Sequence, residues 1–304
     1  MTNEFPLVSI AMATYNGEKY LPMQLDTLIN QSYPNIEIVI TDDKSTDNTL
    51  AIIKEYQSKY QFIRLYAKQS NSGVTQTFEN SVRECKGDFI ALCDQDDLWD
   101  LDKIKIMMQE TGAEDALYSN SILIDEEGES MNKSFSAFMN LQSYYSGAPF
   151  LLANCVPGHT IVMKTDFAKR ILPFPKNLYF DRWISFCAAA NNGIKYIDKG
   201  LVKYRQHASN TIGIGKTRIR NRKETSSELF ENKLCELKAL QTAPISSEET
   251  SNLLNKMVSL FTRSWSLKRS LFFFKNIDKI LVVKNKPYYR KVFYCIKMFF
   301  KSSY

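Results

Sequence analysis

Apolar positions in the first ninety residues fall into four short blocks, with helical patterns between them. The blocks are rich in apolar and β-branched residues, as in buried strands, and they cover Leu7–Ala13, Ile36–Thr41, Phe62–Ala67 and Phe89–Cys93. The intervening stretches carry apolar residues at helical spacing or capping residues at their start, which predicts helices. Strands that alternate with helices at this spacing predict βαβ units and a parallel sheet.

Polar side chains follow three of these predicted strands. Tyr15 follows the first strand, Asp42 and Asp43 follow the second, and Asp94 and Asp96 follow the fourth. Open α/β sheets bind ligands at the carboxyl ends of their strands, so we expect these side chains to converge on one edge. A solvated acidic turn is the alternative for the last cluster when it is considered alone.

The acidic cluster ends the segment Gly87–Asp97, which reads GDFIALCDQDD and contains Asp94, Asp96 and Asp97. Carboxylates this close repel one another unless a cation lies among them. Hard oxygen ligands favour Mg²⁺ or Mn²⁺, and Mg²⁺ commonly completes its shell with water and substrate phosphates. Neither GxxxxGK[ST] nor GxGxxG follows the first strand, which favours a nucleotide diphosphate bound through metal and carboxylates.

The α/β pattern continues to about residue 205. Further predicted elements are a helix at Leu101–Glu110, strands at Ala116–Ile124 and Thr160–Lys164, a helix that begins at Tyr179–Trp183, and short strands at Ile194–Ile197 and Leu201–Arg205. The segment Ser130–Gly147 has no clear period and is predicted to be a mobile loop on the acceptor side.

Length and cysteine usage fit an ordinary folded protein. The chain has 304 residues, enough for one large or two modest domains. Its six cysteines include no CxxC pair, which indicates reduced thiols. The N-terminus lacks a signal-peptide pattern, and no apolar stretch reaches the roughly 18 residues that a membrane-spanning helix needs.

Positive charge is concentrated at the C-terminal end. The net charge is +6, but residues 251–304 hold 12 Lys or Arg and one acid. Residues 266–304 interleave cations with aromatic residues, which favours an in-plane amphipathic attachment to an anionic membrane surface. The alternative is packing of these helices on the catalytic part or on a dimer partner.

A second basic run lies upstream of two predicted helices. Residues 213–223 contain five cations, which favours either a flexible flap near a donor diphosphate or a solvated charge run. Helical patterns follow at Ser227–Leu240 and at Glu248–Trp265.

Six segments together give the sequence a resemblance to the family 2 glycosyltransferases, which adopt the GT-A fold. In the order of the family they are VSIAMATYNG, IVITDDKSTDNT, NSGV, GDFIALCDQDD, FDRW and YRQHASN. The DQDD and YRQH segments look most like the bacterial branch that includes rhamnosyltransferases of surface polysaccharide assembly. The resemblance implies an α/β GT-A catalytic domain over residues 1–212, with a mostly parallel central sheet flanked by helices. It leaves a basic, helical C-terminal extension over residues 213–304.

The resemblance also implies roles for particular residues. Asp94 and Asp96 match the DxD pair that holds the diphosphate of a nucleotide sugar through Mg²⁺ or Mn²⁺. His207 matches a histidine that can complete the metal shell, and Asp181 matches the catalytic base. The positions that contact the nucleoside base are matched by Tyr15 and Asp43.

Simpler explanations exist for several of these residues. Asp181 lies in a first helical turn, where an acid is a favourable cap. A lone histidine such as His207 is commonly a packed or surface residue, and His159 is favoured as a turn residue because Pro157-Gly158 precedes it. Lys44 departs from the family by replacing the glycine usual after the DD pair, which bears on the shape of that loop.

The implied reaction is inverting sugar transfer from a nucleotide diphosphate sugar to a lipid-linked or glycan acceptor in bacterial O-antigen or capsule synthesis. Such a reaction needs a base for the acceptor hydroxyl. Rhamnose from dTDP-rhamnose is favoured, with galactose or glucose from UDP donors as alternatives. The expected location is cytoplasmic, at the inner face of the membrane.

Two other protein classes use some of the same features. A nucleic-acid-binding protein could use the basic tail, but the acidic sheet edge repels a polyanion. A nucleotidyltransferase would need a basic, glycine-rich loop after the first strand, and ATYNGEKY is not one.

Overall fold

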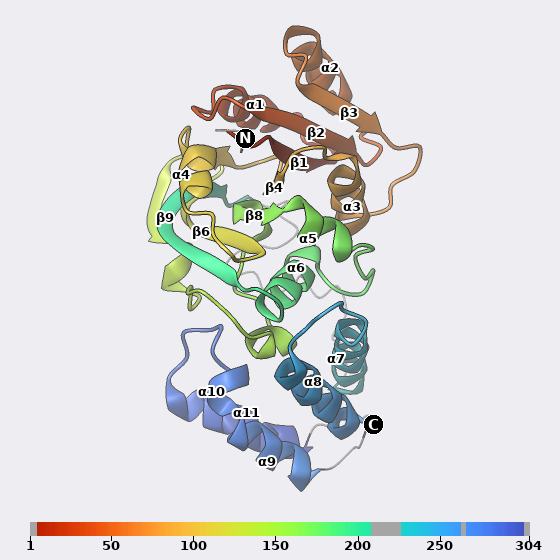
Figure 1. The fold of residues 1–304 in the computed structure, drawn as a ribbon, viewed down its shortest axis with the longest axis vertical. Coiled ribbons are helices and arrows are strands. Elements are labelled where there is room, and N and C mark those ends of the chain that lie inside the picture. The colour runs from red at the N-terminus through yellow and green to blue at the C-terminus, as the bar shows by residue number, and fades with distance from the viewer. Residues whose placement is uncertain (1–4, 208–225, 263–265, 301–304) are drawn as a thin grey trace.

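The computed structural model describes residues 5–207, 226–262 and 266–300, which form an α/β region and a helical C-terminal region (Figure 1). The strands are β1 (Val8–Thr14), β2 (Ile36–Asp42), β3 (Ile63–Ala67), β4 (Phe89–Cys93), β5 (Leu98–Trp99), β6 (Ala116–Ile124), β7 (Ser130–Ser134), β8 (Ile161–Lys164) and β9 (Ile194–Arg205). The α-helices are α1 (Leu21–Ile29), α2 (Thr49–Lys59), α3 (Val74–Glu84), α4 (Lys103–Gln109), α5 (Thr165–Arg170), α6 (Phe180–Ala189), α7 (Ser226–Leu240), α8 (Glu248–Phe261), α9 (Leu267–Lys275), α10 (Ile277–Ile280) and α11 (Tyr288–Phe300). Three 3₁₀ helices are η1 (Phe135–Ala137), η2 (Ala148–Leu151) and η3 (Gly158–Thr160).

The central sheet has the strand order β3-β2-β1-β4-β8-β6-β9-β5, with β7 paired to β6. Strands β1 to β4 are parallel to one another, and α1, α2 and α3 connect them in sequence. Strand β8 runs antiparallel to β4 and β6, whereas β9 runs parallel to β6. The predicted α/β fold is therefore confirmed, and its parallel part is the half that carries the predicted site.

A single strand, β9, replaces the two short strands predicted at residues 194–197 and 201–205. Ile197 pairs with Ser119 and Gly200 pairs with Asn120, so two residues of β9 bulge out between these pairs. A bulge interrupts the ladder locally while both halves stay in one sheet. The apolar pattern breaks at the bulge, which explains why it predicted two strands.

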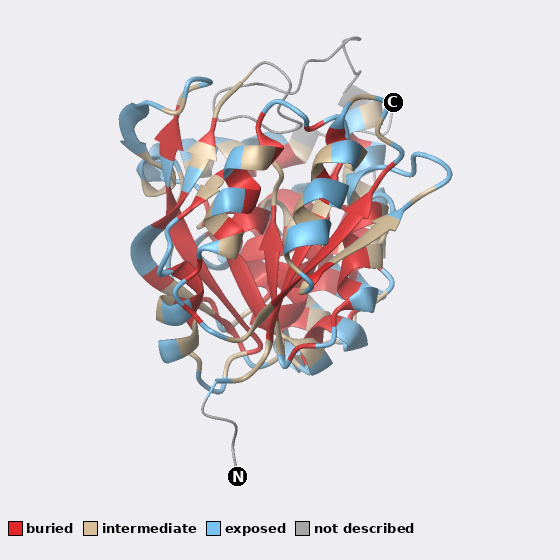
Figure 2. Ribbon diagram, turned by 90° about the horizontal axis from the view of Figure 1, so that it is seen from above, coloured by how far each residue is buried: buried red, intermediate tan, exposed pale blue. Residues whose placement is uncertain are grey.

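The sheet buries side chains on both faces. Along β1, Val8, Ile10 and Met12 enter the core beneath α1, α2 and α4, whereas Ala11 enters the core that contains α3, α5 and α6. Figure 2 shows the buried strands at the centre, with helices on either side exposing only their outer faces. Burial on both faces explains why these strands are continuous apolar runs in the sequence.

The C-terminal helices extend one of these two cores. Phe230 on α7, Leu254 on α8 and Phe273 on α9 belong to the same buried cluster as α6. Arg182 on α6 also forms an ion pair with Glu236 on α7 at 2.6 Å. Packing on the catalytic part, one of the two alternatives for the tail, is thus observed for the buried faces of these helices.

Some sequence predictions for the C-terminal part lie outside the described residues. These are the basic run at 213–223, the domain boundary between residues 212 and 213, and the last residues of the helix predicted to reach Trp265. In the structure that helix, α8, ends at Phe261.

The segment Ser130–Gly147 has more regular structure than the predicted loop. It contains β7 and η1. The backbone N–H of Asn140 donates to the carbonyl of Val283 at 3.1 Å, and Met139 pairs with Lys284. These contacts attach the segment to the C-terminal helical region.

No α-helix within the described ranges is both long enough and apolar enough to cross a lipid bilayer.

Candidate active site

The carboxyl ends of β1, β2 and β4 lie side by side, as the parallel pattern predicts. Thr14 at the end of β1 pairs with Asp42 at the end of β2, and β4 flanks β1 on its other side. The loops that leave these strands carry Tyr15, Asp43 and Asp94. All three residues therefore lie at one edge of the sheet, where α/β folds bind ligands.

Asp42 organises the loop after β2. Its carboxylate accepts hydrogen bonds from Thr14 Oγ1 at 2.9 Å and from the backbone N–H of Ser45 at 2.8 Å. The turn between them holds Lys44 at a φ of +66°. This left-handed conformation is costly for a residue with a Cβ, and it is the one that a glycine adopts freely.

Replacing Lys44 with glycine should therefore stabilise the protein, by about 0.5 to 1 kcal/mol, because the relief of backbone strain exceeds the entropy that glycine loses on folding. Urea denaturation of the two proteins measures this difference. Lys44→Ala removes the same side chain but keeps the Cβ, so it should give no such gain. Equal stabilities for the glycine and alanine variants would contradict the explanation.

Asp43 fastens the loop that precedes α3. Its carboxylate accepts hydrogen bonds from Lys68 Nζ at 2.8 Å and from the backbone N–H groups of Ser72 and Gly73 at 2.9 and 2.8 Å. Burial alone would raise the pKa of Asp43, but these hydrogen bonds outweigh it and hold the pKa below its ordinary value. The role predicted for Asp43 in contacting a nucleoside base stays a prediction, and in this structure the carboxylate first shapes the loop.

Gln95, between the two acids of the DxD pair, joins their loop to the loop after β1. Its amide oxygen accepts from the backbone N–H of Tyr15 at 2.9 Å, and its amide nitrogen donates to the Tyr15 carbonyl at 3.0 Å. A Cβ at Gly17 would lie 2.3 Å from this amide oxygen, so a larger residue there would displace the Gln95 side chain from these hydrogen bonds. The ring of Tyr15 stays half exposed at the site edge. Sequence analysis did not identify Gln95, although its position inside DQDD was a usable signal.

Asp96 and His207 meet, as their predicted common role requires. His207 Nε2 lies 2.8 Å from Asp96 Oδ2, and the His207 ring packs on Tyr20 with 4.9 Å between centroids. Arg205, which is almost fully buried, donates from Nε to the backbone carbonyl of Asp96 at 2.9 Å. The end of β9 thus holds the DxD loop and delivers His207 to it.

Asp97 is the third carboxylate of the cluster and is completely buried. Its Oδ1 accepts from the backbone N–H of Arg205 at 3.0 Å, whereas its Oδ2 has no hydrogen-bond partner within the described part of the chain. Burial, and then the charges of Asp96 and Asp94, raise the pKa of Asp97 well above its ordinary value. A buried carboxylate oxygen of this kind is satisfied by a proton or a cation.

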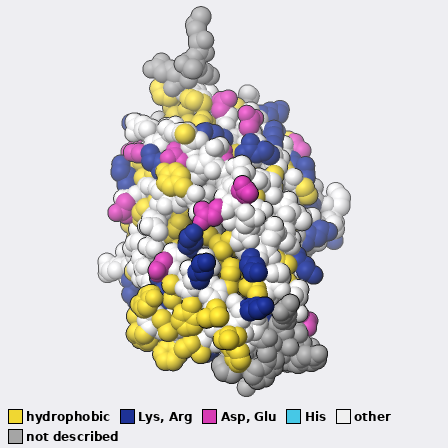
Figure 3. Space-filling view, turned by 60° about the horizontal axis from the view of Figure 1, so that its bottom comes forward, with side chains coloured by type: hydrophobic (Ala, Val, Ile, Leu, Met, Phe, Trp, Pro, Cys, Tyr) yellow, Lys and Arg dark blue, Asp and Glu magenta, His cyan; other side chains and the backbone are white. Residues whose placement is uncertain are grey.

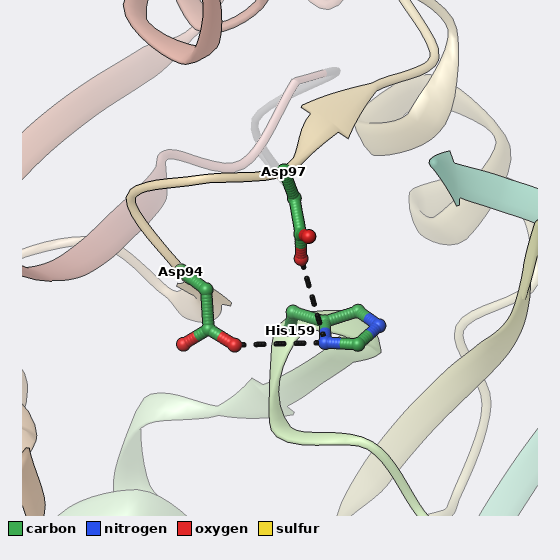
Figure 4. A group of neighbouring side chains, drawn as sticks. All are labelled: Asp94, Asp97 and His159. Carbon is green, nitrogen blue, oxygen red and sulfur yellow. Dashed lines mark ion pairs between the residues drawn. The ribbon is translucent and has the colours of Figure 1, made fainter. Parts of the chain in front are cut away.

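His159 faces two of these carboxylates, as Figure 4 shows. Its Nδ1 lies 3.6 Å from Asp94 Oδ2 and 3.5 Å from Asp97 Oδ2, and its Nε2 lies 2.8 Å from Ser121 Oγ. The sequence favoured a turn residue, and His159 does lie in the short helix η3. Its buried ring nevertheless belongs to the site, which the flanking Pro157-Gly158 did not reveal.

A buried lysine, Lys103, packs next to this cluster. Lys103 on α4 donates from Nζ to the backbone carbonyl of His159 at 2.8 Å, and its Nζ lies 3.3 Å from the centre of the Trp99 ring. Burial lowers the pKa of Lys103 to about 7. Its charge opposes the rise in the pKa of Asp97, so Lys103 is an electrostatic partner of the cluster.

The acidic groups form a triad and a pair. Ligand atoms of Asp94, Asp97 and His159 lie within 4.8 Å of one another, whereas Asp96 pairs with His207. The predicted set of Asp94, Asp96 and His207 does not form such a group among the described residues. Carboxylate oxygens with imidazole nitrogen suit a divalent ion such as Mn²⁺. The side chains of Asp94 and Asp96 are 35% and 21% exposed, whereas Asp97 is closed off. A substrate phosphate could therefore reach a cation on the predicted set more readily than one on the buried set.

Asp181, the predicted base, lies at the start of α6 and beside η3. A Cβ at Gly158 would lie 3.6 Å from the Cβ of Asp181 and 2.9 Å from the Phe180 ring, so η3 packs directly against this helix end. Burial raises the pKa of Asp181 to about 6, against hydrogen bonds from the Arg182 backbone and the Asn154 side chain, and the charge of Asp94 adds to the rise. The segment that presents His159 to the carboxylates therefore also contacts Asp181.

Solved structures with the same architecture identify the fold class. Staphylococcus aureus TarS (residues 1–349, in complex with UDP-GlcNAc) superposes with a TM-score of 0.59 at 20% identity, covering 90% of this chain and 81% of that one. The mannosyltransferase PcManGT from Pyrobaculum calidifontis, in complex with GDP-Man and Mn²⁺, superposes with a TM-score of 0.52 at 16% identity, covering 83% and 69%. The chain has the GT-A fold. It belongs to glycosyl transferase family 2, whose profile matches residues 9–172.

Two curated relatives illustrate the range of this family. The dTDP-rhamnosyl transferase RfbG of Shigella flexneri is 32% identical over 217 residues, which cover 66% of this chain and 73% of RfbG. Chondroitin synthase of Escherichia coli is 31% identical over 134 residues, which cover 43% of this chain but only 19% of that enzyme. The second match therefore concerns one segment of a much longer protein.

Proposed function

We propose that this protein transfers a sugar from a nucleotide diphosphate sugar to a hydroxyl group of a saccharide acceptor, with inversion at the anomeric carbon. The observation that carries the proposal is the group formed by Asp94, Asp97 and His159, with the Asp96–His207 pair on the same loop and Asp181 next to it across η3. Membership of the family supports the reaction class.

Asp181 is the proposed base. It accepts the proton of the acceptor hydroxyl while that oxygen bonds to the anomeric carbon and the bond from this carbon to the diphosphate oxygen breaks. A carboxylate is suited to this role when its pKa approaches the working pH, and burial raises the pKa of Asp181 to about 6. A simple helix cap would gain nothing from such a shift.

Asp94, Asp96 and His207 would hold a divalent ion, Mg²⁺ or Mn²⁺. When bound, such an ion offsets the negative charge that develops on the departing diphosphate. Asp97 and His159 lie beneath this set as its buried support, and they are the alternative ligands together with Asp94. The Mn²⁺ bound by PcManGT supports a divalent ion in this fold.

The donor sugar and the acceptor are inferred from relatives. Rhamnose from dTDP-rhamnose is favoured because RfbG, a dTDP-rhamnosyl transferase, is similar over two thirds of this chain. UDP donors are the alternative. Tyr15, with its ring half exposed, and Asp43 are proposed to contact the nucleoside. The proposed acceptor is a lipid-linked saccharide or glycan of a bacterial surface polysaccharide such as O-antigen or capsule, reached at the cytoplasmic face of the membrane.

A panel of nucleotide sugars, each incubated with the protein and Mn²⁺, tests this function through release of the nucleoside diphosphate. We expect release from one donor class, with dTDP-rhamnose the first candidate. Release only from UDP-sugars would support the proposed reaction but identify a UDP-sugar, not dTDP-rhamnose, as the donor. If no donor in the panel releases its diphosphate, with or without saccharide acceptors, the proposed function is wrong.

The pH dependence of this activity should reflect Asp181. Because a base must be unprotonated and burial raises the pKa of Asp181 to about 6, kcat/KM should fall about tenfold for each pH unit below 6. The residual activity of Asp181→Asn should lack this acid limb, which separates Asp181 from other groups that titrate nearby. A wild-type profile that stays flat down to pH 5, where thermal melting still shows a folded protein, would contradict the assignment.

A further inference from the structure

A pocket lies far along the chain from the carboxylate cluster, between the C-terminal helices and Ala153. It has a volume of about 300 Å³. Its polar lining consists of five cations, Lys284, Lys286, Arg290, Lys291 and Lys297, and its apolar lining includes Leu281, Val283, Phe293 and Tyr294. Among the described residues, no acidic side chain lines it.

Within the ranges that the structure describes, none of the five cations lies within 4.0 Å of an Asp or Glu oxygen. Lys291 is the least exposed of the five. Burial, together with the charge of Lys286, lowers the pKa of Lys284. Positive groups that converge on one pocket repel one another, so a bound anion would stabilise them. Phosphate and diphosphate groups carry the charge and the acceptor oxygens for several cations at once.

An exposed apolar surface adjoins this pocket. On α9, the exposed side chains Leu267, Leu271 and Phe274 recur at helical spacing, and on α11 Phe293 and Ile296 do the same. Figure 3 shows the apolar side chains gathered on this end of the molecule, with several Lys and Arg side chains beside them. Contiguous exposed apolar side chains next to cations are typical of surfaces that enter the headgroup region of a membrane.

The apolar surface also distinguishes between lipid phosphates and nucleic acid as the anion that binds here. Cations with aromatic side chains suit nucleic acid as well as lipid phosphates. A nucleic acid, however, offers no apolar medium for Leu267, Leu271 and Ile296, whereas the acyl boundary of a bilayer does. The combination therefore favours a lipid.

The pocket is connected to the proposed acceptor side of the active site. Ala153 lines the pocket, and the side chain of the next residue, Asn154, lies near enough to Asp181 to lower the pKa of that carboxyl. Just upstream, the carbonyls of Phe150 and Leu151 accept hydrogen bonds from Arg182 at 2.9 and 2.5 Å. One short segment thus contacts the pocket on one side and the start of α6 on the other.

We propose that this pocket binds the phosphate or diphosphate headgroup of a membrane lipid while the exposed faces of α9 and α11 enter the acyl boundary. A saccharide carried on that lipid would then lie on the Asp181 side of the 150–154 segment. This inference rests on the proposed function, because it names the class of acceptor that the same site uses.

Vesicle co-sedimentation of the full-length protein tests the proposal. The probes are phosphatidylcholine vesicles, the same vesicles containing phosphatidic acid, and vesicles matched in charge with phosphatidylserine. We expect binding to be strongest with phosphatidic acid, whose phosphate is the most accessible. Since each cation near an anionic membrane contributes about 1 kcal/mol, Lys291→Gln/Lys297→Gln should weaken binding about 30-fold.

A matched control removes the same charge elsewhere. Lys54→Gln/Lys105→Gln changes two exposed lysines on α2 and α4, and it should alter vesicle binding less than twofold. Leu271→Gln/Ile296→Gln should weaken binding to all anionic vesicles while leaving thermal melting unchanged, because these side chains are exposed.

Several outcomes would overturn the proposal. Two of them are equal losses of vesicle binding in the pocket and control variants, and no preference for anionic vesicles. A third is a pocket that binds inorganic pyrophosphate but contributes nothing to vesicle binding. Tighter binding of a single-stranded oligonucleotide, lost in the pocket variant, would assign the pocket to nucleic acid instead. Release of nucleoside diphosphate to water is measured in parallel and should persist in the pocket variant. Its absence in the wild type would count against the proposed function alone.

Discussion

Asp181→Asn is expected to lower kcat by roughly 10² to 10⁴ fold while leaving the affinity for the donor nucleotide unchanged. Asparagine keeps the shape of the side chain and the oxygen that accepts from the Arg182 backbone N–H at 2.6 Å. It has no basic oxygen to take the acceptor proton. Release of nucleoside diphosphate in the presence of acceptor measures kcat, and calorimetric titration of the nucleoside diphosphate measures affinity.

Asp166→Asn is the matched control for this prediction. Asp166 and Asp181 are each the second residue of their helix, α5 and α6, but Asp166 is exposed and lies outside the site. If Asp181 acted only as a helix cap, the two substitutions would have similar small effects on stability and none on turnover. A rate near that of the wild type in Asp181→Asn would remove this residue as the base.

Asp181→Asn should also be more stable than the wild type at neutral pH. The pKa of Asp181 is raised in the folded state, so ionisation favours the unfolded state, and stability falls as the pH rises from the ordinary value near 3.8 through about 6. The neutral amide avoids this loss. A melting temperature at or above that of the wild type would show that the lost activity does not arise from unfolding.

Asp96→Asn and Asp94→Asn are expected to have the second large effect, a loss of about 100-fold or more in Mn²⁺ affinity and in donor turnover. Each substitution removes one negative oxygen ligand from the accessible set. Electron paramagnetic resonance of free Mn²⁺ during titration measures the affinity directly, without activity.

Asp97→Asn distinguishes the two ligand sets. If the ion is held by Asp94, Asp96 and His207, Asp97→Asn should bind Mn²⁺ within about tenfold of the wild type, as expected for a supporting residue. A loss of binding in Asp97→Asn and His159→Gln, with normal binding in Asp96→Asn, would show instead that the buried cluster holds the ion.

The sequence predicted the parts of the site that local pattern determines. An apolar run that ends in acids, repeated after parallel strands, placed Tyr15, Asp43 and Asp94 at one edge, because strand direction and connection order leave little freedom. The pairing of Asp96 with His207 was not a matter of pattern. It came from resemblance to the family, and the 2.8 Å contact agrees with it.

Other parts of the site depend on contacts between segments that are distant in the sequence. The periodic pattern of apolar residues does not predict such contacts. His159 follows a Pro-Gly pair, and only the pairing of β8 with β4 and β6 brings its ring to the carboxylates. Arg205 and Lys103 look like ordinary surface cations in sequence, yet both are buried against the DxD region because they satisfy carbonyls and acids there. Burial of a charged group becomes predictable only when its partner is known.

Binding of nucleoside diphosphate with and without a divalent ion tests the central claim most directly. Calorimetric titration of dTDP and UDP into the wild-type protein with Mn²⁺ should give one saturable site for at least one of them, and excess chelator should abolish it. If the nucleoside diphosphate binds with the same affinity in chelator as in Mn²⁺, the carboxylates at the sheet edge do not bind the donor through a cation.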